Sequence, residues 1–275
     1  MRQLKTSVLR KLALPVASAG VLLSTGCTAE GVTCATAHGD FAVKLSLTSG
    51  SDEACNGLVG GWYGVQTYNQ PRSDGRPNAE DSTVAIKSED MGIMIDDYSA
   101  RLGDIPDAVN PPFALGPFSS GKPEGDVCTV PTLAPARQDF PALEAIPAVP
   151  DDPATEEDES EAEVPAEEPK TVEYAWSNMR FIVSPSIIGT VFTANLTHKV
   201  NGCTAEYTAV GLYPAVYCGD DDGNPVDALC APEANPELGT PYGSGINPDF
   251  RDSIKCNPDL LLCMFEDGKL PDALK

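Results

Sequence analysis

The dipeptide Asn201-Gly202 separates two stretches in which apolar and polar side chains alternate. In the first stretch Phe192, Ala194, Leu196 and Val200, together with His198, occupy every second position. Alternation with a period of two is typical of a half-buried β-strand, and Asn-Gly is a preferred sequence for a two-residue type I′ hairpin turn. This turn places Val200 opposite Cys203, and the register then places Leu196 opposite Tyr207 on one apolar face. The segment therefore predicts an antiparallel hairpin.

Other segments carry weaker strand patterns. Residues 41–47 alternate, and four more segments are rich in β-branched and aromatic residues, namely 62–68, 83–87, 172–183 and 210–217. Aromatic residues make up only 7% of the chain, while Gly (24) and Pro (25) are numerous, which favours a turn-rich β domain over a helical bundle. We therefore expect a mainly β fold, an antiparallel sandwich or a barrel-like sheet, which is α+β by strict count because it includes one short helix.

That helix is predicted to follow residue 88. Its apolar residues recur at helical spacing, as Met91, Ile95, Tyr98 and Leu102. Ser88 is placed to cap the N-terminus and Gly103 to end the helix. The charges suit the helix dipole, with Glu89 and Asp90 in the first turn and Arg101 in the last.

A long acidic segment interrupts the strand candidates. Ten Asp and Glu residues and no basic residue lie between positions 151 and 169, and the preceding residues are rich in Pro and Ala. Like-charge repulsion and low hydrophobicity do not offset the entropy of ordering such a chain. We expect residues 132–170 to be a disordered insertion, serving as a surface loop, a spacer, a cation-attracting tract or a docking segment.

The N-terminus carries an export signal. Residues 1–11 contain four basic residues and no acid, and a twelve-residue, mainly apolar run follows. That run is too short to cross a bilayer as a helix, which needs about 20 residues. It leads to Gly26-Cys27, which resembles the lipobox of bacterial lipoproteins, although Ser24 stands where those proteins prefer Leu. The resemblance implies cleavage after residue 26, fatty acylation of Cys27 and, through Thr28, outer-membrane anchoring. The alternative is ordinary secretory cleavage, with Cys27 retained as a structural cysteine.

The cysteine count agrees with this prediction. Nine cysteines are present, and removing Cys27 for acylation leaves an even number. In an exported protein such a set indicates disulfides whose pairing the sequence leaves open. The eight candidates are Cys34, Cys55, Cys128, Cys203, Cys218, Cys230, Cys256 and Cys263.

These observations divide the chain into five parts. Residues 1–26 form the lipoprotein signal, 27–131 the first half of the β domain, 132–170 the acidic insertion, 171–218 the hairpin region that completes the domain, and 219–275 an irregular tail tied by disulfides.

Charge and motifs argue against several functions. The formal net charge of −23 argues against nucleic acid as a partner, because phosphate binding needs a basic face. The chain has no G-x-S-x-G, H-E-x-x-H, P-loop or dinucleotide-binding motif. The sequence therefore favours a non-enzymatic protein, and a carboxylate-based or calcium-dependent hydrolase remains as the alternative.

Three features are candidate sites: the two histidines, an Asp-rich loop and a short motif that contains Trp. His38 has Asp40 two residues away, and His198 lies on the apolar face of the hairpin, where a core histidine is the simpler interpretation. Asp220, Asp222 and Asn224 have the spacing of the first calcium ligands of an EF-hand, but Pro225 stands where that loop needs Gly. We expect no cofactor, with calcium at residues 220–224 as the alternative to a polar turn.

The third feature is Gly60-Gly61-Trp62-Tyr63, which resembles the G-x-W opening of lipocalins, small barrels that carry apolar ligands. The resemblance covers four residues. It leaves a lipocalin-like carrier as another alternative, beside the simpler interpretation that a large aromatic side chain fills the bottom of a β core.

Several longer segments resemble a family of predicted lipoproteins from myxobacteria. These segments are residues 33–42, 211–218, 243–250 and 256–263, among them Gly211-Leu-Tyr-Pro-Ala-Val-Tyr-Cys218. The resemblance implies export and anchoring, and it implies no particular chemistry. We therefore expect an envelope lipoprotein that contacts the membrane through its lipid and whose disulfide-stabilised β domain has a structural role or binds a protein or a small ligand.

Overall fold

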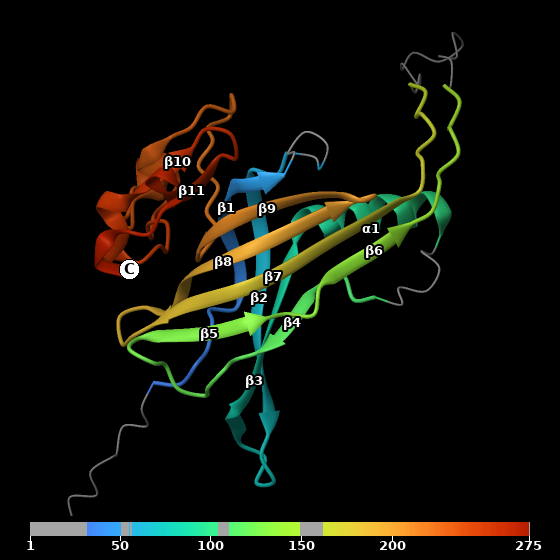
Figure 1. The fold of residues 1–275 in the computed structure, drawn as a ribbon. Coiled ribbons are helices and arrows are strands. Elements are labelled where there is room, and N and C mark those ends of the chain that lie inside the picture. The colour runs from blue at the N-terminus through green and yellow to red at the C-terminus, as the bar shows by residue number, and fades with distance from the viewer. Residues whose placement is uncertain (1–31, 51–54, 56, 104–109, 149–161, 275) are drawn as a thin grey trace, which may run out of the picture. The chain divides into compact units, whose positions relative to one another are not determined.

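The computed structural model describes residues 32–50, 55, 57–103, 110–148 and 162–274 (Figure 1). Its main element is one antiparallel sheet in which the strands follow the order β4-β3-β2-β1-β9-β8-β7-β5, with β6 also paired to β7. The strands are β1 (Gly39–Gly50), β2 (Gly60–Pro71), β3 (Pro77–Ser88), β4 (Ala114–Pro117), β5 (Val127–Thr132), β6 (Ala136–Phe140), β7 (Lys170–Val183), β8 (Ile188–Val200) and β9 (Cys203–Leu212). The first strand thus pairs with the last, and both halves of the chain build one sheet. The predicted fold class, mainly antiparallel β with one main helix, is confirmed.

The hairpin predicted around Asn201-Gly202 is formed by β8 and β9. Its register pairs Val200 with Cys203 and Leu196 with Tyr207, as predicted. Asn201 and Gly202 both have positive φ, at 51° and 89°, as a type I′ turn requires. The apolar residues of both strands lie on the inner face of the sheet, where Leu196 and Tyr207 are buried.

The predicted helix is α1 (Glu89–Leu102). The Ser88 side chain accepts a hydrogen bond from the Met91 N–H, and the Gly103 N–H bonds to the Ser99 carbonyl, so both predicted ends are confirmed. Met91 and Tyr98 are buried in the main core. Leu102 is 43% exposed, because the apolar stripe leaves the sheet before the last turn of the helix.

Aromatic side chains fill the inner face of the sheet. Phe192 lies at the centre, with its ring centroid 5.5 Å from Phe41, 5.4 Å from Phe181 and 6.5 Å from Trp176. Trp176 contacts Tyr63 in turn, with an edge-to-face arrangement at 5.5 Å. These contacts fill the interior of the sheet with one continuous core. A lipocalin keeps the corresponding space open for its ligand.

The sheet is not a closed barrel. Its strand order begins at β4 and ends at β5. In the described residues these edges meet at one isolated bridge, in which Leu115 and Ala134 exchange two backbone hydrogen bonds of 3.1 and 2.8 Å, and at a hydrogen bond of 2.8 Å from the Ser119 N–H to the Thr129 carbonyl. These contacts join the edges without forming a continuous ladder between them.

The insertion predicted over residues 132–170 is wrong at both of its ends. Strand β6 lies inside it and pairs with β7, and the bridges Leu143–Glu167 and Ile146–Val164 extend this pairing toward the acidic residues. Leu133, Phe140 and Leu143 are buried in the main core. The prediction rested on the high content of Pro and Ala and overlooked an alternation of inward and outward residues. In this alternation Gln138 and Phe140 point inward. Residues 149–161 lie outside the described part of the chain.

One acid of the predicted insertion, Glu167, holds this extension to α1. Its carboxylate lies 3.1 Å from Nη1 of Arg101 and 3.2 Å from Nζ of Lys170, and it accepts a hydrogen bond from the Tyr98 hydroxyl. The hydrogen bond from Lys170 is the largest of the effects that lower the pKa of Glu167. A carboxylate with three such partners is an ordered part of the fold.

The tail after residue 218 forms a small module of its own. It contains β10 (Ile254–Asn257), β11 (Leu262–Phe265) and several short 3-10 helices, and β10 pairs with β11. Its core includes Phe250, Ile254 and Phe265, which pack with Val191 and Leu212 of the main sheet. The strand predicted over residues 210–217 stops at Leu212, two residues before Pro214, which has no N–H to donate.

Candidate functional site

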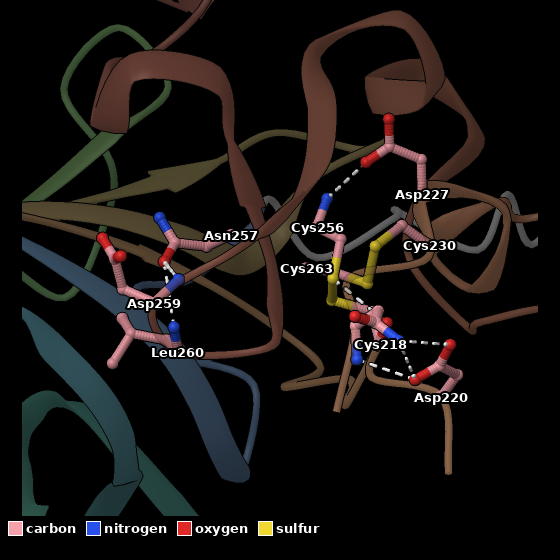
Figure 2. The surroundings of a disulfide bond; sticks show 10 residues. Cys218, Asp220, Asp227, Cys230, Cys256, Asn257, Asp259, Leu260 and Cys263 are labelled. Carbon is pink, nitrogen blue, oxygen red and sulfur yellow. Dashed lines mark hydrogen bonds between the residues drawn. A yellow bond between two sulfur atoms is a disulfide. The ribbon is translucent and has the colours of Figure 1, made fainter. Parts of the chain in front are cut away.

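All eight cysteines that follow Cys27 form disulfides. Two bonds tie the main sheet, Cys34–Cys128 and Cys55–Cys203. The other two, Cys218–Cys256 and Cys230–Cys263, lie side by side in the tail module (Figure 2). The Cα atoms of the four pairs are 5.5 to 5.8 Å apart, within the usual range for disulfides. Cys27, the predicted acylation site, lies outside the described residues, as does the predicted signal over residues 1–26.

The sulfur atoms of the tail are a structural centre. Those of Cys218, Cys230 and Cys263 lie within 4.8 Å of one another, a spacing at which three ligand atoms could hold a metal ion. Each of these sulfurs is in a disulfide, so it offers no thiolate to a metal. Asp227 supports the same centre, since its carboxylate accepts the Cys256 N–H at 2.9 Å (Figure 2).

The calcium candidates lie in a turn between two cysteines. Oδ1 of Asp220 accepts backbone N–H groups from Asn224 at 2.7 Å and from Asp222 at 3.0 Å, and the Asn224 side-chain amide also donates to it. The backbone bond from Asn224 is the main cause that lowers the pKa of Asp220. The Asp220 oxygens are thus engaged by N–H donors within the loop. Calcium binding at Asp220, Asp222 and Asn224 stays a prediction.

The two histidines lie in different environments. His38 is exposed, and no hydrogen bond or ion pair joins it to Asp40 in the described structure. His198 is 1% exposed, and its ring centroid lies 4.7 Å from that of Tyr174. Burial lowers the pKa of His198 to about 4, although a hydrogen bond with the Cys55 backbone acts in the opposite direction. His198 is therefore a neutral core residue at pH 7.

Trp62, the aromatic residue of the lipocalin-like sequence, lies on β2, the second strand of the chain. It packs with Ala42, Leu262 and Met264 against the tail module, on the face opposite the main core. Tyr63 is the residue that enters the core, where it is 1% exposed. Neither position opens the interior of the sheet to a ligand.

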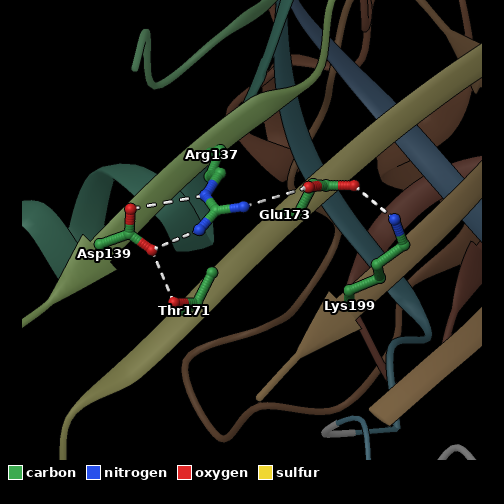
Figure 3. Close-up of polar contacts among 5 residues, drawn as sticks. All are labelled: Arg137, Asp139, Thr171, Glu173 and Lys199. Carbon is green, nitrogen blue, oxygen red and sulfur yellow. Dashed lines mark hydrogen bonds and ion pairs between the residues drawn. The ribbon is translucent and has the colours of Figure 1, made fainter. Parts of the chain in front are cut away.

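A row of charges crosses the outer face of three strands. Glu173 on β7 lies opposite both Arg137 on β6 and Lys199 on β8 in the register, and its carboxylate is 3.9 Å from the guanidinium and 2.8 Å from the ammonium (Figure 3). Asp139 joins the row through Arg137 at 3.0 Å and accepts a 2.6 Å hydrogen bond from Thr171. That bond, followed by Arg137, lowers the pKa of Asp139. All the charges of this row are paired, which suits a solvated sheet surface better than a reactive site.

Sequence reasoning missed this row, because β6 was assigned to the insertion. The signal that could have found it is the alternation of Arg137 and Asp139 with the inward residues Ala136, Gln138 and Phe140.

None of the helices among the described residues is long and apolar enough to cross a membrane.

Comparison with known proteins points to one family. A family model described as MlpA matches residues 39–214, well over half of the chain and the whole span from β1 to β9. The protein named "Putative lipoprotein MlpA" from Myxococcus xanthus is 30% identical to the chain over 88 residues, which is 32% of this chain and 32% of that protein. The similarity therefore spans about a third of that relative. No solved structure matches the chain.

Proposed function

Since the chain belongs to the MlpA family, we propose that it is an exported lipoprotein, tethered to the bacterial envelope by fatty acylation of Cys27. Its disulfide-stabilised β domain has a binding or structural role. The family relation extends over the sheet, and the name of the Myxococcus relative refers to a lipoprotein.

The cysteine pairing carries this proposal. The four disulfides use every cysteine from Cys34 to Cys263, which leaves Cys27 without a partner cysteine in its own chain. An unpaired thiol in an oxidising compartment is reactive, and acylation removes it. If Cys27 were a structural cysteine, no other cysteine of the same chain would be free to form a disulfide with it.

The same proposal includes the outer membrane as the destination. Thr28 follows the acylated cysteine, and the resemblance to enteric lipoproteins associates Asp at that position, and not Thr, with retention in the inner membrane. The mature domain would then stand in the periplasm or on the cell surface, where its four disulfides persist.

A single substitution tests the anchor. In cells fed with a clickable palmitate analogue, Cys27→Ser should abolish labelling of the protein and move it to the soluble fraction. The matched control is Thr28→Ser, which alters the neighbouring hydroxyl residue and should leave both labelling and membrane association unchanged. Separating the membranes on a density gradient places the unaltered protein in the outer or the inner fraction. Membrane association that persists in Cys27→Ser would overturn the lipoprotein assignment.

A further inference from the structure

We propose that a cleft between the outer face of the main sheet and the C-terminal segment binds a fatty acid, with cationic side chains holding its carboxylate. The cleft measures about 330 Å³. It lies on the opposite side of the sheet from the aromatic core, so it is unrelated to a barrel interior. Its lining residues are Arg180, Ile182, Thr193, Thr208, Val210, Gly268, Lys269, Leu270 and Leu274.

Strand register builds the floor of the cleft. Arg180 on β7 lies opposite Thr193 on β8, Thr193 lies opposite Val210 on β9, and Val210 lies opposite Lys44 on β1. Directly opposed residues of an antiparallel pair point to the same face. A cation therefore stands at each end of a row whose middle is a hydroxyl and an apolar side chain.

The C-terminal segment supplies the roof and a third cation. Lys269 lines the cleft from that segment, and its neighbour Gly268 packs on Lys44, since a methyl group added at Gly268 would meet Lys44 Cγ at 2.8 Å. Lys44 is not itself a lining residue, but it adjoins two of them, Val210 and Gly268. Two positive side chains from distant parts of the sequence, Arg180 and Lys269, thus line one small space, and Lys44 lies beside it.

These cations lack the partners that most others have. Seven of the thirteen Lys and Arg side chains in the described part of the chain form ion pairs with Asp or Glu. The remaining six are Lys44, Arg72, Lys87, Lys122, Arg180 and Lys269, of which Arg180 and Lys269 line this cleft and Lys44 adjoins it. In a protein with 41 acids and 18 bases, a cluster of unpaired cations is unexpected unless it serves an anion from outside.

The shape and lining of the cleft select the class of anion. Ile182, Val210, Leu270 and Leu274 offer apolar contacts, so the ligand has a hydrocarbon part. A space of 330 Å³ is at the small end of ligand pockets and suits one alkyl chain better than a two-chain lipid. The planar guanidinium of Arg180 can bind a carboxylate through two parallel hydrogen bonds.

Two acids fix which way the ligand lies. Beyond Arg180 the cleft adjoins a wider recess, also lined by Glu124 and Asp126. These acids would repel a carboxylate, so the head is expected between Arg180, Lys44 and Lys269, with the chain along Ile182 and the leucines.

Calorimetric titration tests the site on the full mature chain carrying Cys27→Ser, which removes the anchor and keeps the domain. Decanoate, kept below its micelle concentration, should bind saturably with one site. Decanol and decyltrimethylammonium have the same chain with no charge or the opposite charge, and each should bind at least tenfold more weakly. Arg180→Gln and Lys269→Gln should each weaken decanoate binding about tenfold. Arg72→Gln is the matched control, because Arg72 is an unpaired cation in the β2–β3 turn and should leave binding within twofold.

The outcomes separate this proposal from its alternatives. Equal affinity for decanoate and decanol, or equal affinity in Arg180→Gln and the parent, would overturn it, provided that the variants melt as the parent does. Flotation with phosphatidylglycerol vesicles but no binding of free decanoate would assign the cations to a membrane surface instead. Because the protein tested is unanchored, a negative result here leaves the assignment of Cys27 untouched, and the reverse also holds.

Discussion

A glycine opposite an aromatic ring governs the packing of the main core. Gly211 on β9 is the register partner of Phe192 on β8. A methyl group on Gly211 would overlap the Phe192 ring, which contacts Phe41 and Phe181 on its other sides. The ring therefore cannot yield without disturbing the whole aromatic cluster.

Gly211→Ala should lower the free energy of unfolding by about 1 to 3 kcal/mol, the usual cost of overpacking a core. The matched control is Gly92→Ala in α1, where the added methyl group meets Lys87 at an ordinary 3.5 Å. Replacing Gly by Ala within a helix should raise stability by about 0.5 to 1 kcal/mol. Urea denaturation of both variants measures the two effects, and changes of the same sign in both would contradict the packing argument.

His198 makes stability depend on pH in a direction that its burial sets. Burial lowers its pKa from 6.5 to about 4 in the folded protein. At a pH between these two values, His198 is protonated in the unfolded chain and neutral in the folded protein. The contribution of His198 to stability is complete above pH 6.5 and is lost as the pH falls toward 4. In the described structure Nδ1 of His198 is buried and has no hydrogen-bond partner. A proton added at Nδ1 would therefore have no acceptor to stabilise it.

His198→Phe should therefore flatten the acid side of the stability curve. Between pH 7 and pH 4.5, the loss of unfolding free energy should be smaller than in the parent by about 2 to 3 kcal/mol. Denaturant titrations at several pH values provide the measurement. His38→Gln is the control, because His38 is exposed, and it should follow the parent curve. A parent curve retained by His198→Phe would show that other groups carry the acid sensitivity.

At the scale of elements, local signals predicted what local interactions build. The β8–β9 register follows from one turn and one alternation, and the ends of α1 follow from Ser88 and Gly103. The sequence did not predict strands β5 and β6, because they are short edge strands whose pairing with β7 joins residues about 30 to 55 positions apart. The disulfide pairs and the cationic cleft escaped for the same reason, because their members meet only through the sheet order.

Strand β6 also alters the expected effect of removing the acidic segment. Replacing residues 149–161 with a short Gly/Ser linker keeps Leu133, Phe140, Leu143 and the bridge between Ile146 and Val164, so we expect the melting temperature to change little. Replacing residues 132–170 should abolish cooperative unfolding, since Leu133, Phe140 and Leu143 are lost from the core. Calorimetry of the two deletions distinguishes these results. Equal tolerance of both would show that β6 contributes nothing to stability.

At the scale of the whole molecule, the two halves of the disulfide set stabilise different things. Cys34–Cys128 and Cys55–Cys203 brace a sheet that already has a large core, whereas the tail has two four-residue strands and builds its own core partly from its cysteines. Small modules of this kind depend on such bonds.

Reduction should therefore unfold the tail before the sheet. In hydrogen exchange monitored by mass spectrometry, the reduced protein should lose amide protection over residues 218–265 while β8 and β9 keep theirs, and each bond should be worth about 2 to 4 kcal/mol. Before reduction, denatured Cys27→Ser protein should contain no free thiol. Two or more free thiols, or a uniform loss of protection, would contradict this division.

The order of the disulfides along the chain has a consequence for how the protein matures. The two disulfides of the main sheet interleave along the chain, because Cys55 lies between Cys34 and Cys128. The two disulfides of the tail module also interleave, because Cys230 lies between Cys218 and Cys256. No native bond joins two cysteines that are consecutive in the sequence. If the chain is exported as we propose, an oxidase that couples thiols in the order of their emergence from the translocon would make only non-native bonds. We therefore expect the yield of the oxidised protein to fall in a host that lacks a disulfide isomerase.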